Sequence, residues 1–558
     1  MPKMSDPVRP DPRRWFAAGV VIASVAIPVL DNTVLNVAIP TILREFHTDL
    51  PSLQWVITGY SLTFATLLII GGRLGDMYGH RRMFMVGATI FGVGSLLASV
   101  SHSVPTLVLG EAIIEGIGAS LLIPATLSIL STTFEGPERA IAFAAWGTVA
   151  GAAVAFGPLV GGFLTTQYSW RWALRINVIA APLFVLGALL FMRPDERHGR
   201  RPSIDAPGAM MIAAGSFAFV FGLSEAATYG MFHPLQDFSV NGRVLWPATR
   251  PISIAPLAIG VAAVILAVFY TYERAKERRN GDPLFEFSQL EHLSFRYGLL
   301  TTMVLAMGQF GFLLVIPVLL QDGQHFTALR AGVYMVPMGV LIALGAPIGG
   351  RFTRVIGTTR VVRTGLVFEA VGLVVVALMI STHTTLLALL PGSILFGLGV
   401  GFASSQLTNV ILSEVDREKA GVASGTNTTV RQVGAALGIA VIGSLLNAQA
   451  IRHAVRAVDG SPAISAPLKA LTIASIRAKG VNYAPPRVAR PSQVAALTHA
   501  LQGSVVDGAR PALLFAAAVV TLGAFLSLLI PTYGPPSTGE APEPGVEPGE
   551  IAVAVEML

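Results

Sequence analysis

The chain alternates long apolar runs with short polar segments along most of its length. Runs of about 20 mostly apolar residues, enough for a helix to cross the hydrocarbon core of a membrane, recur from Trp15 to Pro531. We therefore predict an all-α integral membrane protein with fourteen membrane-spanning helices. The predicted spans are 15–38, 53–72, 83–100, 105–130, 140–164, 173–192, 206–226, 253–271, 295–320, 331–350, 361–381, 385–410, 422–446 and 511–531.

The distribution of Lys and Arg predicts the orientation of these spans. The segments on one side of the predicted membrane hold 23 Lys and Arg, whereas the short loops opposite hold 6. Basic residues gather on the cytoplasmic side, so both termini are predicted in the cytoplasm of a bacterial cell, with the chain in the cytoplasmic membrane. Residues 1–14 form the N-terminal tail, and the acidic, Pro-rich segment 532–558 forms a disordered C-terminal tail. The segment 447–510 is a long extracytoplasmic loop.

Three short patterns in the first half recur in the second half at nearly one offset. Gly71-Gly72-Arg73-Leu74 returns as Gly349-Gly350-Arg351-Phe352, 278 residues later (349 minus 71). The other two pairs are Glu138-Arg139-Ala140 with Glu418-Lys419-Ala420, and Gly157/Gly161 with Gly434/Gly438. The repeat predicts two six-helix bundles at 15–193 and 294–531, with two inserted helices at 206–271. In this 6+2+6 arrangement, two six-helix repeats that meet around a site at the middle of the membrane are typical of transporters.

Composition narrows the class of protein further. The chain has 558 residues, of which 53% are hydrophobic and 13% charged, with a mean hydropathy of +0.66. A soluble chain carries about 25% charged residues, so the charged fraction of this chain is too low for a water-soluble protein. The absence of cysteine excludes disulfides and thiolate chemistry, and no G-x-x-x-x-G-K-[ST] pattern for ATP occurs. The net charge of +6 reflects cytoplasmic loops rather than nucleic-acid binding.

The segment after the second span reads Gly72-Arg73-Leu74-Gly75-Asp76-Met77-Tyr78-Gly79-His80-Arg81-Arg82. It resembles the signature G-x-L-x-D-x-x-G-x-R-R of the major facilitator superfamily. The resemblance implies the major facilitator fold and a cytoplasmic gate that latches the two halves. The second copy carries Arg354 in place of Asp76, so the latch is predicted in one half only. A basic loop that only sets orientation is the alternative. The implied gate residues are Gly72, Arg73, Asp76, Gly79, Arg81 and Arg82.

The first span contains Leu30-Asp31-Asn32-Thr33-Val34-Leu35-Asn36-Val37-Ala38-Ile39-Pro40. This stretch resembles the fourteen-helix drug:proton antiporters of the superfamily (EmrB/QacA-like), and Asp31 stands at their acidic position. A carboxylate inside a span is costly and by default functional. Desolvation favours its protonated form, which predicts a role in proton coupling. The alternative places Asp31 close enough to the outer interface to be merely hydrated.

The fourth span carries two carboxylates one helical turn apart, Glu111 and Glu115. They share one helix face, so they are predicted to share a proton or to hold the charge of a cargo. The family pattern has Arg at the position of Ala112 and Gln at that of Glu115, so a mechanism that needs this Arg is in doubt. A structural pair bonded to Ser or Thr hydroxyls is the alternative.

The fifth and thirteenth spans also contain candidate functional residues. Gly157, Pro158, Gly161 and Gly162 in the fifth span resemble the G-P-x-x-G-G motif of antiporters, although a kinked packing helix explains them nearly as well. Arg431 in the thirteenth span requires a carboxylate, carbonyls or water. It is a possible intramembrane partner of the carboxylates, or a structural residue near the second span.

The family resemblance implies that spans 1, 4, 9 and 12 line a cavity. Met and aromatic side chains suit adaptable apolar binding, although the same residues serve equally for packing or lipid contact. The candidate cavity residues are Met303, Met307, Gln309, Phe310, Gln406 and Asn409.

The sequence thus predicts a proton-coupled antiporter that exports lipophilic or cationic drugs or toxic compounds by alternating access. It is expected to be monomeric, to need no cofactor or metal besides the proton motive force, and to contact small molecules, protons and membrane lipid. Export of an endogenous lipid or metabolite is the alternative. A membrane enzyme is disfavoured because no H-E-x-x-H or G-x-S-x-G pattern faces the membrane. A receptor is disfavoured because the internal repeat and the buried carboxylates would have no function in it.

Overall fold

The computed structural model describes residues 12–47, 50–195, 205–234, 236–240, 243–279, 281, 283–416, 419–479 and 491–532. These residues are almost wholly helical. The first half of the chain forms α1 (Arg14–Phe46), α2 (Leu50–Tyr78), α3 (His80–Ser99), α4 (Val104–Leu107), η1 (Val108–Glu115), α5 (Gly116–Thr133), α6 (Gly136–Gln167) and α7 (Arg171–Phe191).

A pair of helices follows, separated by a short helix and an antiparallel pair of strands. These elements are α8 (Ala206–Ser224), α9 (Ala226–Tyr229), β1 (Phe238–Val240), β2 (Arg243–Trp246) and α10 (Ile254–Arg278). The remaining elements are η2 (Phe287–Glu291), α11 (Leu293–Val318), η3 (Leu319–Gly323), α12 (Ala328–Ile356), α13 (Thr358–Met379), α14 (Leu386–Ser413), α15 (Ala420–Gly460), α16 (Ala466–Lys479), α17 (Pro491–Leu526) and η6 (Ser527–Leu529).

Twelve helical segments among the described residues are long and apolar enough to cross a membrane. The hydropathy pattern predicts fourteen spans, and α2 and α6 are the two segments that fall outside the twelve. Both contain side chains that lie outside the described part of the structure, and the count of twelve rests on described residues alone. The protein is therefore an all-helical, multi-pass membrane protein.

Glycine ends corresponding helices in the two halves. Gly79 (φ 102°) separates α2 from α3, and Gly357 (φ 84°) separates α12 from α13. Glycine adopts positive φ without the steric cost that a Cβ imposes. The two glycines lie 278 residues apart (357 minus 79), which is the offset of the sequence repeat. The repeat thus extends to the backbone conformation of these turns.

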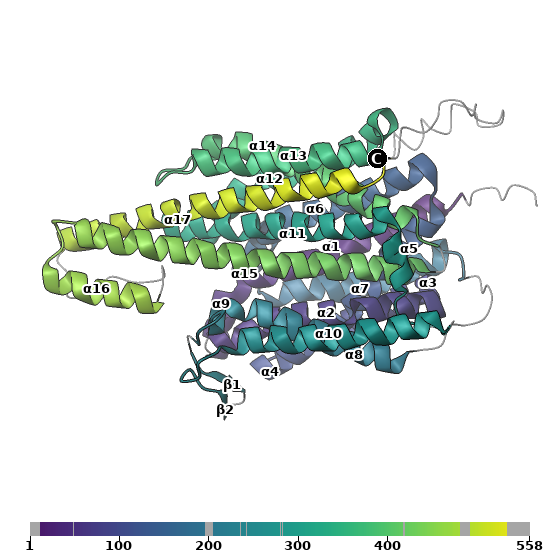
Figure 1. Ribbon diagram of the computed structural model, residues 1–558, viewed down its shortest axis with the longest axis horizontal. Helices are drawn as coiled ribbons and strands as arrows, with labels where there is room; N and C mark the ends of the chain where they lie inside the picture. The colour runs from purple at the N-terminus through teal and green to yellow at the C-terminus, as the bar shows by residue number, and fades with distance from the viewer. Residues whose placement is uncertain are drawn as a thin grey trace, which may run out of the picture.

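Helices from the two halves pack directly against one another. α2 packs on α15, and α6 packs on α12. α8 contacts both α2 and α15, while α10 lies beside α8 at one edge of the bundle (Figure 1). The inserted pair therefore covers the seam between α2 and α15, with α10 on the outside.

The segment 447–510, predicted as a loop, is largely helical. α15 continues to Gly460, α16 follows, and α17 begins at Pro491. Figure 1 shows α15 and α17 running beyond the other helices, with α16 folded back beside them. Hydropathy marks apolar helices, so it does not predict helices in this charged segment, and its extracytoplasmic position stays a prediction. The segment has a core of its own, formed by Ala454, Val458, Ile464, Leu468, Ile476 and Leu497.

Close packing of α15 on α11 gives a testable expectation. A Cβ at Gly438 would overlap the carbonyl oxygen of Met307, and overpacking of this kind costs about 1–3 kcal/mol. We expect Gly438→Val to lower the melting temperature of the purified protein in detergent. Gly443→Val on the same helix is the matched control, because a Cβ there meets only the flexible end of Leu314. Equal melting temperatures for the two variants would contradict this packing.

Candidate functional site

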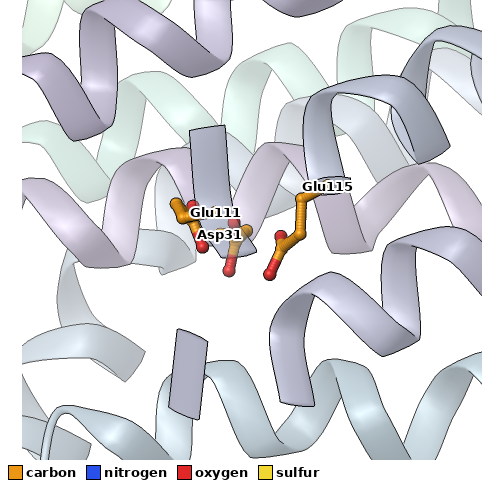
Figure 2. Close-up of side chains that lie close together, drawn as sticks. All are labelled: Asp31, Glu111 and Glu115. Atoms are coloured by element: carbon orange, nitrogen blue, oxygen red, sulfur yellow. The ribbon is translucent and has the colours of Figure 1, made fainter. Parts of the chain in front are cut away.

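Three buried carboxylates meet between α1 and the fourth span. Asp31, Glu111 and Glu115 are 3%, 2% and 0% exposed. One oxygen atom from each lies within 4.8 Å of those of the other two. Figure 2 shows the three side chains pointing into one small region. The structure thus brings together the three residues that the sequence singles out for proton coupling, and Asp31 is buried rather than hydrated at an interface.

The local form of the fourth span aligns its two carboxylates. Glu111 and Glu115 belong to η1, a stretch of π-helix between α4 and α5. A π-helix is formed by i→i+5 hydrogen bonds, and such turns occur often at functional sites. The sequence predicts a shared helix face, but nothing in its pattern predicts the π-helical turn.

The surroundings of the three carboxylates are mainly apolar. Residues including Val25, Tyr60 and Phe91 form the adjoining core. Asn177 of α7 donates a hydrogen bond from Nδ2 to Oδ1 of Asp31 at 2.8 Å. No Lys or Arg among the described residues forms an ion pair with the cluster.

Several oxygens of the cluster have no hydrogen-bond partner. They are Oδ2 of Asp31, Oε2 of Glu111 and both carboxylate oxygens of Glu115. Like charges repel strongly at this separation in a medium of low dielectric constant. The cluster therefore requires a compensating charge, which protons or a cationic group supply. The hydroxyl of Ser95 is a neighbour of Glu115, so a structural pair bonded to Ser or Thr hydroxyls stays an alternative for Glu111 and Glu115.

Asp76 joins the two halves at the end of α2. Its Oδ1 accepts a hydrogen bond from the backbone N–H of Gly421 at 2.7 Å, and its Oδ2 accepts one from Val422 at 2.9 Å. These N–H groups lie in the first turn of α15, where intrahelical acceptors are lacking and the helix dipole favours an anion. The carboxylate is fully buried. Asp76 thus caps a helix of the other half.

The remaining residues of the predicted gate act within the first half. Arg81 donates hydrogen bonds from Nε and Nη2 to the carbonyl oxygens of Ala188 and Leu189 at the end of α7. The backbone N–H groups of Arg81 and Arg82 donate to the carboxylate of Asp195. Arg73 is partly buried, and its Nε has no partner. Asp76 is therefore the residue of the motif that bridges the halves by side-chain hydrogen bonds.

Two other features tie the start of α15 to its surroundings. Lys419, just before the helix, pairs with Glu286 at 2.7 Å. Burial alone would lower the pKa of Lys419, but its hydrogen bond to Glu286 and the charges of Glu286 and Asp416 raise that pKa above its ordinary value. The hydroxyls of Ser128 and Ser424 lie 3.0 Å apart across the halves. The bundle is closed at this end.

The glycines of the antiporter-type motif lie at a helix contact. A Cβ at Gly161 would lie 2.9 Å from Cα of Val34, so α6 approaches α1 closely there. Gly157 is buried in the same helix. The side chain of Pro158 and the surroundings of Gly162 lie outside what the structure describes. The geometry fits the packing alternative and does not separate it from a role in export.

The predicted cavity residues lie on α11 and α14, which pack against each other. Gln309 is buried and donates to Oγ of Ser404 at 3.0 Å, and it lines a small pocket in the second half. Met303 and Met307 lie where α11 meets the glycines of α15. Gln406 is fully buried with both polar atoms unpartnered, while Phe310 and Asn409 are partly buried.

A second buried carboxylate site, which is absent from the sequence predictions, lies in the other half. Arg431 lines the same small pocket, together with Thr302, Gln309, Ser404 and Thr408. The carboxylate whose charge acts on Arg431 is Glu369 of α13, and no ion pair links Arg431 to the Asp31 cluster. Glu369 lies within the predicted span 361–381, so the rule that selects Asp31 selects it as well.

Known proteins resemble the chain over most of its length. The probable actinorhodin transporter of Streptomyces coelicolor is 33% identical over 462 residues, which are 81% of this chain and 75% of that protein. The puromycin resistance protein pur8 of Streptomyces alboniger is 33% identical over 442 residues, or 78% of this chain and 82% of that protein. The multidrug resistance protein Stp of Mycobacterium tuberculosis is 28% identical over 420 residues, or 75% and 73%.

A solved structure shares the fold. The human organic anion transporter MFSD10 (TETRAN) superposes with a TM-score of 0.57 over 93% of this chain and 100% of that chain, at 14% sequence identity. The bundle of membrane-spanning helices and its likeness to transporters define a membrane transport protein and not an enzyme. Residues 21–439 match the Major Facilitator Superfamily, and the chain belongs to that family.

Proposed function

We propose that this protein exports small drug-like molecules across the bacterial cytoplasmic membrane in exchange for protons. The observation that carries the proposal is the cluster of Asp31, Glu111 and Glu115, buried and without a basic partner among the described residues. Protons arriving from outside neutralise the cluster, and a cationic cargo takes their place from the cytoplasm. No bound cofactor is needed in this scheme, because the proton motive force supplies the energy.

Drug-like cargo is supported by the relatives. They include proteins named for resistance to puromycin and lincomycin, and proteins named for multidrug resistance or efflux. Membrane lipid is expected to surround the helices, and we expect the protein to act as a monomer.

We further propose fourteen membrane crossings in a 6+2+6 order. α2 and α6 have 29 and 32 residues, and a helix of this length is about 45 Å long at 1.5 Å per residue. Both pack between helices that meet the criteria for spans. An even number of crossings leaves both termini on one side, and the basic loops support the cytoplasm as that side.

Alternating access is the mechanism that we propose for the two halves. The contacts of Asp76 with Gly421 and Val422 join them at one end. Release of those hydrogen bonds would let this end open while the other closes. The single Asp in the motif supports one such latch rather than two.

Transport in proteoliposomes tests the proposed function. Purified protein is reconstituted with rhodamine 123, a lipophilic cation, and a pH gradient is imposed. We expect rhodamine 123 to move against its own gradient when the proton gradient is present and to stop when an uncoupler dissipates it. Movement that ignores the proton gradient would exclude proton coupling.

A second candidate function is export of one endogenous compound. The relatives include a probable actinorhodin transporter and a tetracenomycin C resistance and export protein, each named for a single compound. Deletion of the gene would then cause one metabolite or lipid to accumulate in the cell. Broad drug resistance on overexpression, without such accumulation, favours the first function.

A further inference from the structure

The small pocket in the second half has the chemistry of an anion site. Its lining combines hydroxyl and amide groups from α11 and α14 with the guanidinium of Arg431 on α15. The space inside is small enough for about one water molecule, which suits an oxygen atom of a charged group rather than a whole molecule. Arg431 and Ser404 keep some accessible surface, so their polar atoms can contact a ligand atom in this space.

The guanidinium of Arg431 has unused hydrogen-bonding capacity. No described residue accepts a hydrogen bond from it, and its electrostatic partner Glu369 acts across a gap. Both carboxylate oxygens of Glu369 are buried and without a hydrogen-bond partner. A buried ion pair that serves only stability is normally hydrogen-bonded, because unpaired buried charge is costly. Charge compensation at a distance leaves the donors of Arg431 free for a ligand.

We propose that this pocket binds an anionic oxygen group, a carboxylate or a phenolate, of an organic cargo. The planar guanidinium presents paired N–H donors that match a carboxylate. The amide of Gln309 and the hydroxyls of Thr302 and Thr408 add polar contacts beside it. The inference deepens the proposed function. The cluster at Asp31 selects protons or positive charge in one half, and Arg431 selects negative charge in the other.

Glu369 then sets the strength of anion binding. Its negative charge partly offsets that of Arg431, so that the empty site does not hold an uncompensated cation. An anionic cargo competes with this attraction. Removal of the charge of Glu369 is therefore expected to strengthen anion binding, whereas removal of the charge of Arg431 weakens it.

Binding of two matched dyes to the purified full chain tests the proposal. Fluorescein carries a carboxylate and a phenolate, and rhodamine 123 is a cationic methyl ester on the same ring scaffold. Fluorescence anisotropy at pH 8 gives both affinities without a membrane or a gradient. We expect Arg431→Gln to weaken fluorescein binding by at least about tenfold, because charge-assisted hydrogen bonds are lost, while rhodamine 123 binding changes by less than about twofold.

Two further variants keep the test decisive if Arg431→Gln fails to fold. Arg431→Lys retains the charge and is expected to keep part of the fluorescein affinity, and Glu369→Gln is expected to tighten fluorescein binding. The proposal is overturned if the wild-type protein shows no saturable fluorescein binding, if these variants affect both dyes equally, or if Glu369→Gln leaves fluorescein binding unchanged. Proton-driven export of rhodamine 123 would survive each of these results, so the two proposals fail separately.

Discussion

We expect Asp31→Asn to lower the initial rate of proton-driven rhodamine 123 export by at least about tenfold. The amide keeps the size of the side chain and can still bond Asn177, but it cannot take up or release a proton. Asp31 comes from α1, whereas the other two carboxylates share one helix, so its replacement removes the charge that α1 brings to the cluster. The rate is measured in proteoliposomes under an imposed pH gradient, with equal amounts of reconstituted protein.

Glu45→Gln is the matched control for this variant. Glu45 lies on the same helix, but it faces solvent and pairs with Arg171 at 2.5 Å. The control variant should transport at close to the wild-type rate. Glu111→Gln and Glu115→Gln are expected to show intermediate rates, because each keeps Asp31 on α1 together with one Glu on the fourth span. An Asp31→Asn protein with wild-type rate and unchanged dependence on the gradient would remove this residue from the mechanism.

The sequence predicts much of the site because its residues obey local rules. An acidic residue inside an apolar run is exceptional wherever it occurs, and a spacing of four places two residues on one helix face. What the sequence does not contain is the approach of α1 to η1, which depends on packing between distant segments. The sequence therefore predicts two candidate sites, Asp31 and the Glu111/Glu115 pair, and the structure joins them in one cluster.

Glu369 shows how the same local rule is missed when a family pattern guides the search. The repeat offset pairs it with Phe91 (369 minus 278), and the structure gives both residues the same setting. A Cβ at Gly118 would crowd the backbone nitrogen of Phe91, and one at Gly399 would crowd that of Glu369. An aromatic residue in one half thus corresponds to a carboxylate in the other. A comparison of charged residues between the two repeats would have identified the exchange.

The structure differs from the hydropathy prediction in the extension beyond residue 447, which is charged and nevertheless helical. The extension beyond residue 447 carries charges that mark a loop on any hydropathy scale, yet its apolar residues cover one another in a core of their own. Hydropathy reports contact with lipid, and helices that contact protein or water escape it.

The second large effect is expected on loss of the hydrogen bonds between Asp76 and α15. We expect Asp76→Ala to open the closed end of the bundle and to slow export by about tenfold. The substitution removes both acceptors of the N–H groups of Gly421 and Val422, and loss of a helix cap costs about 0.5–2 kcal/mol. This cost falls only on the closed form, so the balance between the two forms shifts towards the open one.

Spin-label distances measure this shift directly. The chain has no native cysteine, so Thr133→Cys on α5 and Arg354→Cys on α12 give one defined pair of labels, on exposed positions of opposite halves. In the Asp76→Ala protein the distribution should move to longer distances. Asp195→Ala is the matched control, because that carboxylate also accepts two backbone N–H bonds, from Arg81 and Arg82, but within one half. If both variants leave the distances unchanged, Asp76 does not hold the halves together, and the loss of one cap alone cannot gate this transporter.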